Sequence, residues 1–453
     1  MFLSCHFQLL VLSLSYIPNS SAQSLDDSTT DPTKRAESAL STLQSWYNGD
    51  TGIWDTAGWW NAANIMTMVG NLAKADSDNE GLQSLVTRVF ANTMTQAPSK
   101  NPQPGVEEFA YRRQVLNPSN EASALYDGSH MGSGYTKILV SATNEPLSIY
   151  PQNWTQSKRK HANNGEFINT SAPRRRTTQT TLASTPDPKP WLDGFYDDDL
   201  WWALAWINAY DITSNTEYLY LAQGIFIAVT SVWPSHCNNG GIYWSWKKTY
   251  VNAVSNELFM SVAAHLANRA NSRDQKEIYV QWAERTLTWF QNSGMINAHG
   301  TINDGLTDAC ENNHQTTWSY NQGIILGALV ELHRATPDPS YLSLAAKIAK
   351  AALQELTDQN GVIHDVCEPN CGGDGTQFKG VFMRNLQTLQ AAAPDDDYVA
   401  VIQANADSIW MNDWDEGQEG AFSVDWAGPF VWWANASTHG SAMDALVAAM
   451  AVG

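Results

Sequence analysis

Three consecutive aspartates, Asp197, Asp198 and Asp199, are followed at once by two tryptophans, Trp201 and Trp202. The alanine-rich apolar residues after them are typical of a helix, which places the carboxylates where a loop meets a helix. Asp199 is well placed as the N-cap of that helix, a sufficient structural reason for one aspartate but not for three beside two indole rings. The segment therefore predicts a pair of catalytic carboxylates, and a solvated acidic cap is the competing interpretation.

A pair of neighbouring carboxyl groups suits the cleavage of a glycosidic bond with retention of configuration. Retaining enzymes hold the two groups about 5 to 5.5 Å apart, so that one attacks the anomeric carbon while the other protonates the leaving oxygen. Adjacent residues on a tight loop can meet that separation. A helix N-terminus favours the ionised form of a nucleophile, and repulsion from that anion raises the pKa of its neighbour until it can act as an acid.

Two other acidic clusters are expected to be structural rather than catalytic. The run Asp395, Asp396 and Asp397 precedes Tyr398 without any flanking tryptophan, so we expect it to cap a helix. The cluster at residues 413–416 is expected to be an exposed loop, and a calcium site built from its carboxylates is the alternative.

Motifs of other chemistries are missing from the sequence. It has no G-x-S-x-G elbow, no His-Glu-x-x-His zinc motif and no Walker loop. The glycines within residues 372–375 follow a cysteine-bounded loop rather than a strand, so we interpret them as turn residues. The histidines show no metal-ligand spacing, and we interpret His236, His314 and His364 as structural. We therefore expect no cofactor and no bound metal.

Pairs of helices recur along the chain and must position the aspartates. Each pair is an apolar, Ala-rich helix, a short Asn- or Asp-containing turn, and a second helix that opens with an aromatic–aliphatic step. Four pairs are clear, at residues 203–219, 258–279, 324–342 and 386–399. Residues 35–47 with 59–73 form a further pair, residues 81–95 need a partner from elsewhere, and a last helix at 440–450 brings the total to twelve.

Helical pairs that cannot bury their apolar faces alone must stack on one another. The segments before the first helix of each pair are long, Gly-rich and aromatic, as at residues 48–54, 240–246 and 317–323, whereas the turns after it are short. This asymmetry predicts an all-α fold, a closed (α/α)6 toroid of six helical hairpins with a binding cleft at one end of the inner helices. An open solenoid is the alternative.

The beginning of the chain predicts export. An apolar run at residues 9–14, followed by Ser20, Ser21 and Ala22, indicates a signal peptide over residues 1–22, with a buried N-terminal helix as the alternative. No other apolar stretch approaches the roughly 18 to 20 residues that span a bilayer. The chain is 43% hydrophobic and has no long linker after residue 190, so residues 23–453 are expected to form a single domain.

The net charge of −20 excludes polyanionic partners such as nucleic acid, because a nucleic-acid-binding face needs clustered Lys and Arg. It is typical of a soluble extracellular protein, and we expect a monomer. The 20 tryptophans supply flat apolar rings with one N–H each, which suit contact with sugar rings as well as core packing.

Four cysteines remain after the signal peptide, and an even number in an oxidising compartment indicates disulfides. We expect Cys367 to pair with Cys371, a local bond, and Cys237 to pair with Cys310, a bond that joins two loops. A metal site of His364 with Cys367 and Cys371 is the alternative. Three sequons, at Asn153, Asn169 and Asn435, predict N-glycosylation of a secreted protein.

Residues from about 100 to 190 interrupt the helical pattern. They hold eleven Lys or Arg against seven acids, a local net charge of +4, and are rich in Pro, Ser, Thr and Asn. We expect a mostly disordered insertion. Part of it is hypothesised to be a retained intron, and a basic anchor for an acidic cell-surface polymer is the functional alternative.

The aspartate segment and four later ones resemble the signature of family 76 glycoside hydrolases, the endo-α-1,6-mannanases. The later segments are residues 240–246, 250–259, 317–323 and 378–386, in the family order. The resemblance covers roughly residues 33–95 and 192–450 and implies a six-hairpin α/α toroid. It also implies a glycosidase of the mannan endo-1,6-α-mannosidase type, with Asp197 as nucleophile, Asp198 as acid/base and retention of configuration.

The resemblance further implies which side chains contact α-1,6-mannan. Besides the two aspartates, they are Trp201, Trp202, Trp244, Trp318, Tyr320 and Asn321. Cell-wall members of the family that carry a lipid-anchor tail are thought to transfer mannan, and no such anchor signal is seen before Gly453, which favours a hydrolase. Transglycosylation on α-1,6-mannan during wall assembly and mannan binding without turnover are the alternatives.

Overall fold

The computed structural model describes residues 30–102, 186–415 and 420–453, together with four two-residue strands between residues 135 and 151. Within these residues twelve long α-helices make up most of the fold, as the sequence predicts. They are α1 (Pro32–Ser45), α2 (Trp59–Ala75), α3 (Glu80–Gln96), α7 (Tyr196–Thr213), α8 (Thr216–Thr230), α9 (Ala253–Ala267), α10 (Arg273–Asn292), α11 (Ser319–Ala335), α12 (Pro339–Leu356), α13 (Phe378–Ala392), α14 (Asp396–Asn412) and α15 (Ala436–Val452). Three short 3-10 turns, η1 (Ala97–Lys100), η3 (Lys189–Trp191) and η4 (Gly375–Gln377), stand beside them.

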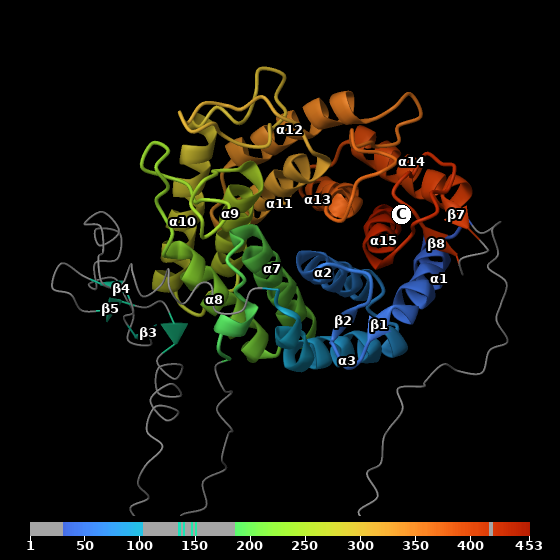
Figure 1. Ribbon diagram of the computed structural model, residues 1–453, viewed down its shortest axis with the longest axis horizontal. Helices are drawn as coiled ribbons and strands as arrows, with labels where there is room; N and C mark the ends of the chain where they lie inside the picture. The colour runs from blue at the N-terminus through green and yellow to red at the C-terminus, as the bar shows by residue number, and fades with distance from the viewer. Residues whose placement is uncertain are drawn as a thin grey trace, which may run out of the picture.

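Six of the helices form an inner ring in which each packs against the next (Figure 1). The ring runs α2, α7, α9, α11, α13 and α15, and α15 packs back against α2. The other six, α1, α3, α8, α10, α12 and α14, lie outside it. Because the ring closes, the expected (α/α)6 toroid is confirmed and the open solenoid is excluded.

The two ends of the helical region complete the ring together. The sequence pairs residues 35–47 with 59–73, but α1 packs mainly on α15, and α2 packs with α3 instead. A helix at the beginning of the chain thus supplies the outer partner of the last inner helix. That pairing is invisible to a search for adjacent hairpins, because about 400 residues separate the two partners.

Close contacts between inner helices depend on glycine. A Cβ added to Gly323 of α11 would lie 2.5 Å from the Cα of Phe382 in α13. One added to Gly380 of α13 would lie 2.6 Å from the carbonyl oxygen of Ser441 in α15. Neighbouring backbones therefore approach more closely than any residue with a side chain would allow, which keeps the ring narrow.

Asn and Asp side chains begin the outer helices. Asn215, Asp338 and Asp395 are the N-caps of α8, α12 and α14, and each accepts a backbone N–H two residues ahead, at 3.1, 2.8 and 3.1 Å. These caps lie in the short turns that the sequence places inside each pair. The acidic run that begins at Asp395 is therefore a helix cap, as predicted.

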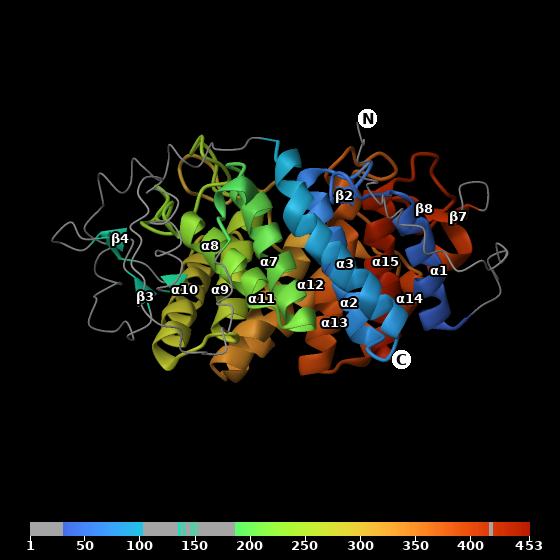
Figure 2. The ribbon, with the colours of Figure 1, turned by 90° about the horizontal axis from the view of Figure 1, so that it is seen from below.

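All six inner helices begin at the same end of the toroid, and the long aromatic loops precede them there. Two short antiparallel strand pairs lie at this end, β1 (Tyr47–Asn48) with β2 (Ile53–Trp54) and β7 (Trp414–Asp415) with β8 (Ala421–Phe422). Figure 2 shows them toward the upper edge, while the C-terminus that follows α15 lies at the lower edge. The end at which the inner helices begin is called the loop end below.

The segment from residue 100 to 190 leaves and re-enters the fold at one point. The side-chain amide of Asn101 donates hydrogen bonds to the carbonyl oxygens of Pro190 and Leu192, at 3.0 and 2.8 Å. Two strand pairs lie within the segment, β3 (Tyr135–Thr136) with β6 (Tyr150–Pro151) and β4 (Leu139–Val140) with β5 (Pro146–Leu147). The predicted disorder otherwise falls outside the described residues, as do the signal peptide and the sequons at Asn153 and Asn169. In the described ranges, no helix has both the length and the hydropathy that a bilayer crossing requires.

Candidate active site

A cavity of about 470 Å³ opens at the loop end of the toroid. Its lining comes from the first turns of inner helices and from the loops before them. The lining residues are Trp60, Phe195, Asp197, Asp198, Trp201, Trp244, Tyr250, Asn252, Val254, Asp304, Tyr320, Asp374 and Phe378. We call this space the aspartate cavity.

The three consecutive aspartates lie in the first turn of α7 rather than on the loop before it. The helix begins at Tyr196 with Phe195 as its N-cap, so the expectation that Asp199 is the N-cap is wrong. Asp199 is fully buried, and its Oδ1 accepts the backbone N–H of Asp193 at 3.0 Å. It therefore fixes the loop that enters the helix, while Asp197 and Asp198 line the cavity.

The beginning of α7 is fastened to the loop before α9. The backbone N–H of Tyr196 donates to the carbonyl oxygen of Trp244 at 2.9 Å, and that of Trp246 donates to the carbonyl oxygen of Gly194 at 2.8 Å. These bonds hold the Trp244 backbone beside the first turn of α7. The Trp244 ring packs on Phe195, with 5.0 Å between ring centroids.

Asp197 has a hydrogen-bond donor that favours its ionised form. The indole Nε1–H of Trp244 donates to Asp197 Oδ2 at 3.1 Å. Burial raises the pKa of Asp197 to about 7, and the neighbouring Asp193 adds to the rise, while hydrogen bonds from the backbone and from Trp244 lower it. The second oxygen, Oδ1, is buried without a hydrogen-bond partner among the described residues. Asp197 thus has one oxygen held by a hydrogen bond that favours the anion and a second oxygen without a hydrogen-bond partner among the described residues.

Asp198 is surrounded by carboxyl groups. Burial raises its pKa well above the ordinary value, and the charges of Asp193, Asp197 and Asp199 raise it further. A hydrogen bond with Asp193 also favours the protonated form of Asp198. Asp193 is itself buried, and its Oδ1 accepts the backbone N–H of Phe195 at 2.9 Å. The proton shared by these groups at neutral pH therefore resides on Asp198.

A third carboxylate reaches the cavity from another loop. Asp304 lies before α11, and the Tyr250 hydroxyl donates a short hydrogen bond to its Oδ2. The side-chain amide of Asn313 donates to the same hydroxyl oxygen at 2.9 Å. Burial raises the pKa of Asp304, and burial together with the charge of Asp304 raises the pKa of Tyr250. Sequence reasoning missed both groups, because a lone Asp or Tyr in a long loop carries no local signal.

Aromatic rings line much of the aspartate cavity. Phe378 and Tyr320 stack with 3.9 Å between centroids and 6° between planes. Trp60 lies against Phe378 and Trp201, and its Nε1–H donates to Asp374 Oδ1 at 2.9 Å. Trp60 and Phe378 were not predicted. Flat rings and carboxylates in one cavity are a lining that fits a sugar, with its apolar faces and hydroxyl edges.

Five predicted site residues line the aspartate cavity. They are Asp197, Asp198, Trp201, Trp244 and Tyr320. Trp202 does not, because it is fully buried against Trp59, Trp191 and Trp206 in the core.

The other two predicted residues support the lining from behind. Trp318 is half-buried as the N-cap residue of α11 and meets Phe378 edge-on at 5.4 Å. Asn321 is fully buried within α11. Trp202, Trp318 and Asn321 therefore do not line the aspartate cavity with the other predicted residues, since matching sequence segments do not tell which residue of a segment faces the cavity.

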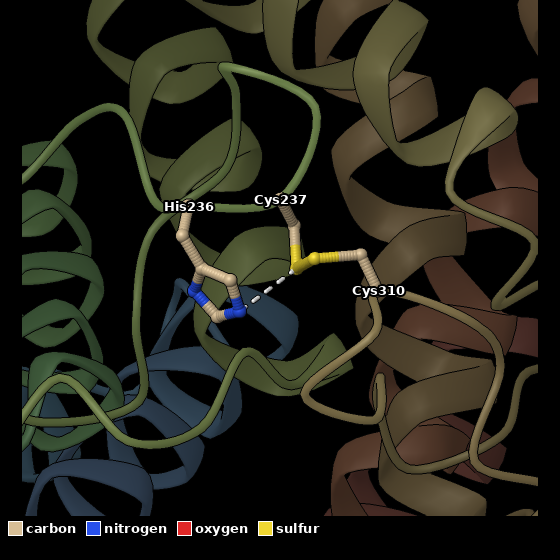
Figure 3. A group of neighbouring side chains, drawn as sticks. All are labelled: His236, Cys237 and Cys310. Atoms are coloured by element: carbon tan, nitrogen blue, oxygen red, sulfur yellow. Dashed lines mark hydrogen bonds between the residues drawn. A yellow bond between two sulfur atoms is a disulfide. The ribbon is translucent and has the colours of Figure 1, made fainter.

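The disulfide between Cys237 and Cys310 ties the loop before α9 to the loop before α11, as the sequence predicts (Figure 3). His236 points its ring at this bond, with 3.6 Å between its Nε2 and the Cys237 sulfur. The second disulfide joins Cys367 and Cys371. The cross-linked loops carry Trp244 and Asp304, so the first disulfide helps to fix two walls of the aspartate cavity.

The metal alternatives do not fit the side chains present. Both sulfurs that a site with His364 would need lie in the Cys367–Cys371 disulfide. His364 instead approaches Glu368 at 2.6 Å, and the Lys379 ammonium pairs with the same carboxylate at 2.5 Å.

The calcium alternative at residues 413–416 rests on Asp413, which is buried and accepts a hydrogen bond from Ser423. Burial raises the pKa of Asp413 to about 8, which makes it a poor cation ligand at neutral pH. Glu416 lies outside the described residues.

The remaining sequon begins at Asn435, the N-cap of α15. Its Oδ1 accepts the backbone N–H groups of Ser437 and Thr438, at 2.8 and 3.0 Å. Glycosylation there stays a prediction.

The profile of glycosyl hydrolase family 76 matches residues 178–452 of this chain. Among curated relatives, the mannan endo-1,6-alpha-mannosidase DCW1 of Candida albicans is 27% identical over 247 residues, covering 50% of this chain and 52% of the relative. DCW1 of Saccharomyces cerevisiae is 27% identical over 218 residues, covering 44% and 47%. The chain spans about half the length of the curated relatives it matches.

Solved structures share the fold. The alpha-1,6-mannanase of Salegentibacter sp. HEL1_6, in an inactive variant with two consecutive aspartates replaced and in complex with alpha-1,6-mannotetrose, superposes with a TM-score of 0.63. It is 18% identical, and the alignment covers 93% of this chain and 99% of that one. Dfg5 from Chaetomium thermophilum, in complex with glucosamine, gives a TM-score of 0.64 at 17% identity, covering 95% and 93%.

Proposed function

Because the chain belongs to glycosyl hydrolase family 76, we propose that it is a secreted, endo-acting glycosidase that cleaves α-1,6-mannosidic linkages in mannan with retention of configuration. The observation that carries the proposal is the pair Asp197 and Asp198, which line one cavity with different surroundings. Asp197 receives a hydrogen bond that stabilises an anion. Asp198 faces carboxylates that keep it protonated.

In the first step Asp197 acts as nucleophile. A carboxylate oxygen of Asp197 bonds to the anomeric carbon while the bond from that carbon to the leaving sugar oxygen breaks. The Asp198 proton passes to the leaving oxygen, so the leaving sugar departs as a neutral alcohol. The Trp244 N–H keeps Asp197 Oδ2 oriented throughout.

In the second step Asp198, now ionised, accepts a proton from a water molecule. The water oxygen bonds to the anomeric carbon and the bond to Asp197 breaks, which restores both groups and the original configuration. A sugar hydroxyl in place of that water gives chain transfer by the same two steps. Hydrolysis and transglycosylation can therefore occur at the same site, and analysis of the products distinguishes them.

The number of aromatic rings in the cavity lining supports internal cleavage. The lining carries Trp60, Phe378, Tyr320, Trp244 and Tyr250. Several aromatic rings can hold more than one sugar unit of a chain. The variant of the Salegentibacter mannanase in which two consecutive aspartates are replaced is inactive and binds alpha-1,6-mannotetrose. This supports the proposal that the consecutive aspartates Asp197 and Asp198 are catalytic here.

Incubation of the secreted protein with unbranched α-1,6-mannan tests the proposal. Proton NMR should show short oligosaccharides whose new reducing ends are first in the α configuration. Products longer than the starting oligosaccharide would indicate transfer, and binding without new reducing ends would contradict catalysis. N-terminal sequencing of the protein from the culture medium tests secretion, and a mature chain that begins near residue 23 is expected.

Two asparagine variants separate the roles of the aspartates. Asp197→Asn should abolish turnover of every substrate, because no nucleophile remains. Asp198→Asn should lose activity on mannan but keep a measurable first step on an aryl mannoside, whose phenolate leaves without a proton. Asp396→Asn is the matched control, since Asp396 is an exposed carboxylate in the first turn of α14 and should leave activity unchanged. Full activity of Asp197→Asn would overturn the mechanism.

A further inference from the structure

Exposed large hydrophobic side chains of the described residues gather at the loop end. They are Trp244, Trp246, Val366, Met411, Trp432 and Trp433. Four are tryptophans, and these lie in the loops before α9 and α15. Val366 lies in the loop before α13, and Met411 lies in the last turn of the outer helix α14, which reaches the same end. A grouping of exposed apolar groups at one end indicates a binding surface rather than chance.

Trp432 and Trp433 are the most remote of these tryptophans from the two aspartates along the ring. Their exposed fractions are 77% and 48%, and neither lines the aspartate cavity. They stand just before α15, and α15 packs next to α2 in the inner ring. The other exposed pair, Trp244 and Trp246, is already part of the cavity rim or next to it.

A hydrogen bond connects the loop of Trp432 and Trp433 to the segment that leads into the cavity wall. The backbone N–H of Ala436, the first residue of α15, donates to Thr56 Oγ1 at 3.1 Å. Thr56 precedes the first turn of α2, where Trp60 lines the cavity. Two residues lie between Trp433 and Ala436, a reach of at most roughly 10 Å in extended chain. The loop of the exposed pair is therefore fastened to the segment that carries Trp60.

The loop is held in place, so the exposure belongs to its folded form. The backbone N–H of Val431 donates to Ser423 Oγ at 3.0 Å. On the other side, Asn435 and Thr438 form a capping box at the beginning of α15. The packing of α15 does not require two exposed indoles, and exposing such rings to water costs free energy in proportion to their apolar area.

The chemistry of this surface fits an uncharged polysaccharide. The net charge of −20 disfavours an anionic lipid surface and a second copy of the chain. A neutral sugar chain offers apolar ring faces that stack on indole and meets no charge repulsion. The proposed substrate could supply this sugar chain, because a long chain that is cleaved internally must extend beyond the aspartate cavity.

We propose that Trp432 and Trp433 form a distal sugar-binding subsite for a mannan chain whose other part lies in the aspartate cavity. The subsite makes the protein bind long chains more tightly than short ones and favours cleavage away from chain ends. The identity of the sugar rests on the proposed function, whereas the binding surface itself does not.

The double variant Trp432→Ala with Trp433→Ala tests the subsite, first for binding. In an Asp197→Asn background, affinity electrophoresis through unbranched α-1,6-mannan should show affinity for the polymer reduced about tenfold. Trp432→Phe with Trp433→Phe should keep most of the affinity, since the rings remain. Asp396→Asn, which changes an exposed side chain outside this group of apolar residues, is the control and should change nothing.

Turnover gives the second readout. With Asp197 intact, the double alanine variant should raise KM for the polymer about tenfold, while kcat/KM for a tetrasaccharide stays within twofold of the unaltered protein. A thermal unfolding midpoint equal to that of the unaltered protein shows that the fold is kept. Polymer affinity and KM that match the unaltered protein overturn the subsite.

Other occupants give different outcomes. Loss of binding to phosphatidylserine or phosphatidylcholine vesicles, or loss of a dimer in sedimentation, with unchanged affinity for mannan would also overturn the proposal. If the unaltered protein cleaves no mannan, the proposed function fails, yet the binding experiment in the Asp197→Asn background still decides the subsite. The two failures are therefore distinguishable.

Discussion

The indole Nε1–H of Trp244 donates to Oδ2 of Asp197 at 3.1 Å, across an interval of 47 residues. The bond depends on the backbone contacts that fasten the loop of Trp244 to the beginning of α7, notably Tyr196 N–H to the Trp244 carbonyl. One loop therefore both orients Asp197 and stabilises its anion. The other oxygen, Oδ1, has no hydrogen-bond partner among the described residues.

Replacing Trp244 with Phe removes the donor and keeps a ring against Phe195. A hydrogen bond to a charged group contributes about 1.5 to 3 kcal/mol, so kcat/KM on mannan should fall about 10- to 100-fold. Loss of the donor also raises the pKa of Asp197, since the Trp244 hydrogen bond lowers it. The acid side of the kcat/KM pH profile should therefore move to higher pH.

Trp246→Phe is the control for that variant, because Trp246 is exposed and does not line the aspartate cavity. Its pH profile should match that of the unaltered protein. An unshifted acid side in Trp244→Phe would mean that the hydrogen bond does not act on the titrating group.

Asp193→Asn should shift the whole pH profile toward lower pH. The charge of Asp193 raises the pKa of Asp198 and, to a smaller extent, that of Asp197. Its removal lowers both pKa values, so Asp197 ionises at lower pH and Asp198 loses its proton at lower pH. Asparagine keeps an oxygen for the Phe195 N–H, which preserves the loop.

The pH dependence of kcat/KM measures that shift. Asp374→Asn is the matched control, because Asp374 lines the same cavity but bonds to Trp60 rather than facing Asp198. A profile of Asp193→Asn that moves to higher pH, or only loses height, would contradict the role of Asp193 in positioning the proton.

The sequence predicts the helices and the aspartate pair because both signals are local. Apolar periodicity at residues 203–211 and three carboxylates before Trp201 need no knowledge of the rest of the chain. The pairing of α1 with α15 is not predictable in this way, since it depends on ring closure between the two ends.

The residues of the cavity lining also differ in whether a local sequence signal predicts them. Trp244 is predicted by a distinctive aromatic segment, whereas Asp304 is one acid in a long loop, where it lines the cavity and accepts a hydrogen bond from Tyr250. Trp202 illustrates the opposite error. It stands one residue from Trp201 in a helix whose two sides are both apolar, and the sequence does not tell which indole faces the core and which the cavity.

A charged network stabilises the end of the toroid opposite the aspartates. Arg269 donates from Nε and Nη2 to the two oxygens of Asp211, at 2.7 and 2.6 Å, and its Nη1 lies 3.5 Å from Glu331. The inner helices end here with partial negative charge on their last carbonyl groups, which cations complement. Arg269→Met removes the cation that bridges the two carboxylates, leaving Lys74 for Asp211 and Arg334 for Glu331. It should lower the free energy of unfolding by about 3 kcal/mol at pH 7.

The same network sets a dependence on pH. Burial raises the pKa of Glu331, but the charges of His265, Arg269 and Arg334 outweigh it and lower the pKa from 4.5 to about 2. A lowered folded pKa gives stability that is present above pH 4.5 and is lost as the pH falls toward 2. The difference in unfolding free energy between the unaltered protein and Arg269→Met should therefore shrink between these values, as urea denaturation at several pH values can measure.

Lys350→Met is the control for the network variant. Lys350 pairs with Asp395 at 2.8 Å on the surface, where solvent screens the interaction, so its loss should be small and nearly independent of pH above 4.5. A pH-independent difference for Arg269→Met would show that its effect comes from lost packing rather than from the carboxylates.

The two disulfides should differ in what they stabilise. Cys237–Cys310 closes an interval of 73 residues and Cys367–Cys371 one of 4. By the loop-closure estimate, the first restricts the unfolded chain by about 4 kcal/mol and the second by about 2 kcal/mol. Replacing both cysteines of the long bond with serine should therefore lower the thermal unfolding midpoint more than the same change in the short bond.

The long bond should also matter for catalysis at temperatures where the fold survives. It joins the loop that carries Trp244 to the loop that carries Asp304, and both reach the aspartate cavity. Cys237→Ser with Cys310→Ser should raise KM for mannan and weaken the effect of a later Trp244→Phe change, since a loosened loop holds the hydrogen bond to Asp197 less well. The short bond lies in the loop before α13, which carries neither Trp244 nor the pair Asp197 and Asp198. Cys367→Ser with Cys371→Ser should therefore leave the effect of Trp244→Phe unchanged. Equal effects of Trp244→Phe in all three backgrounds would show that the loop keeps its position by its backbone contacts with α7 alone.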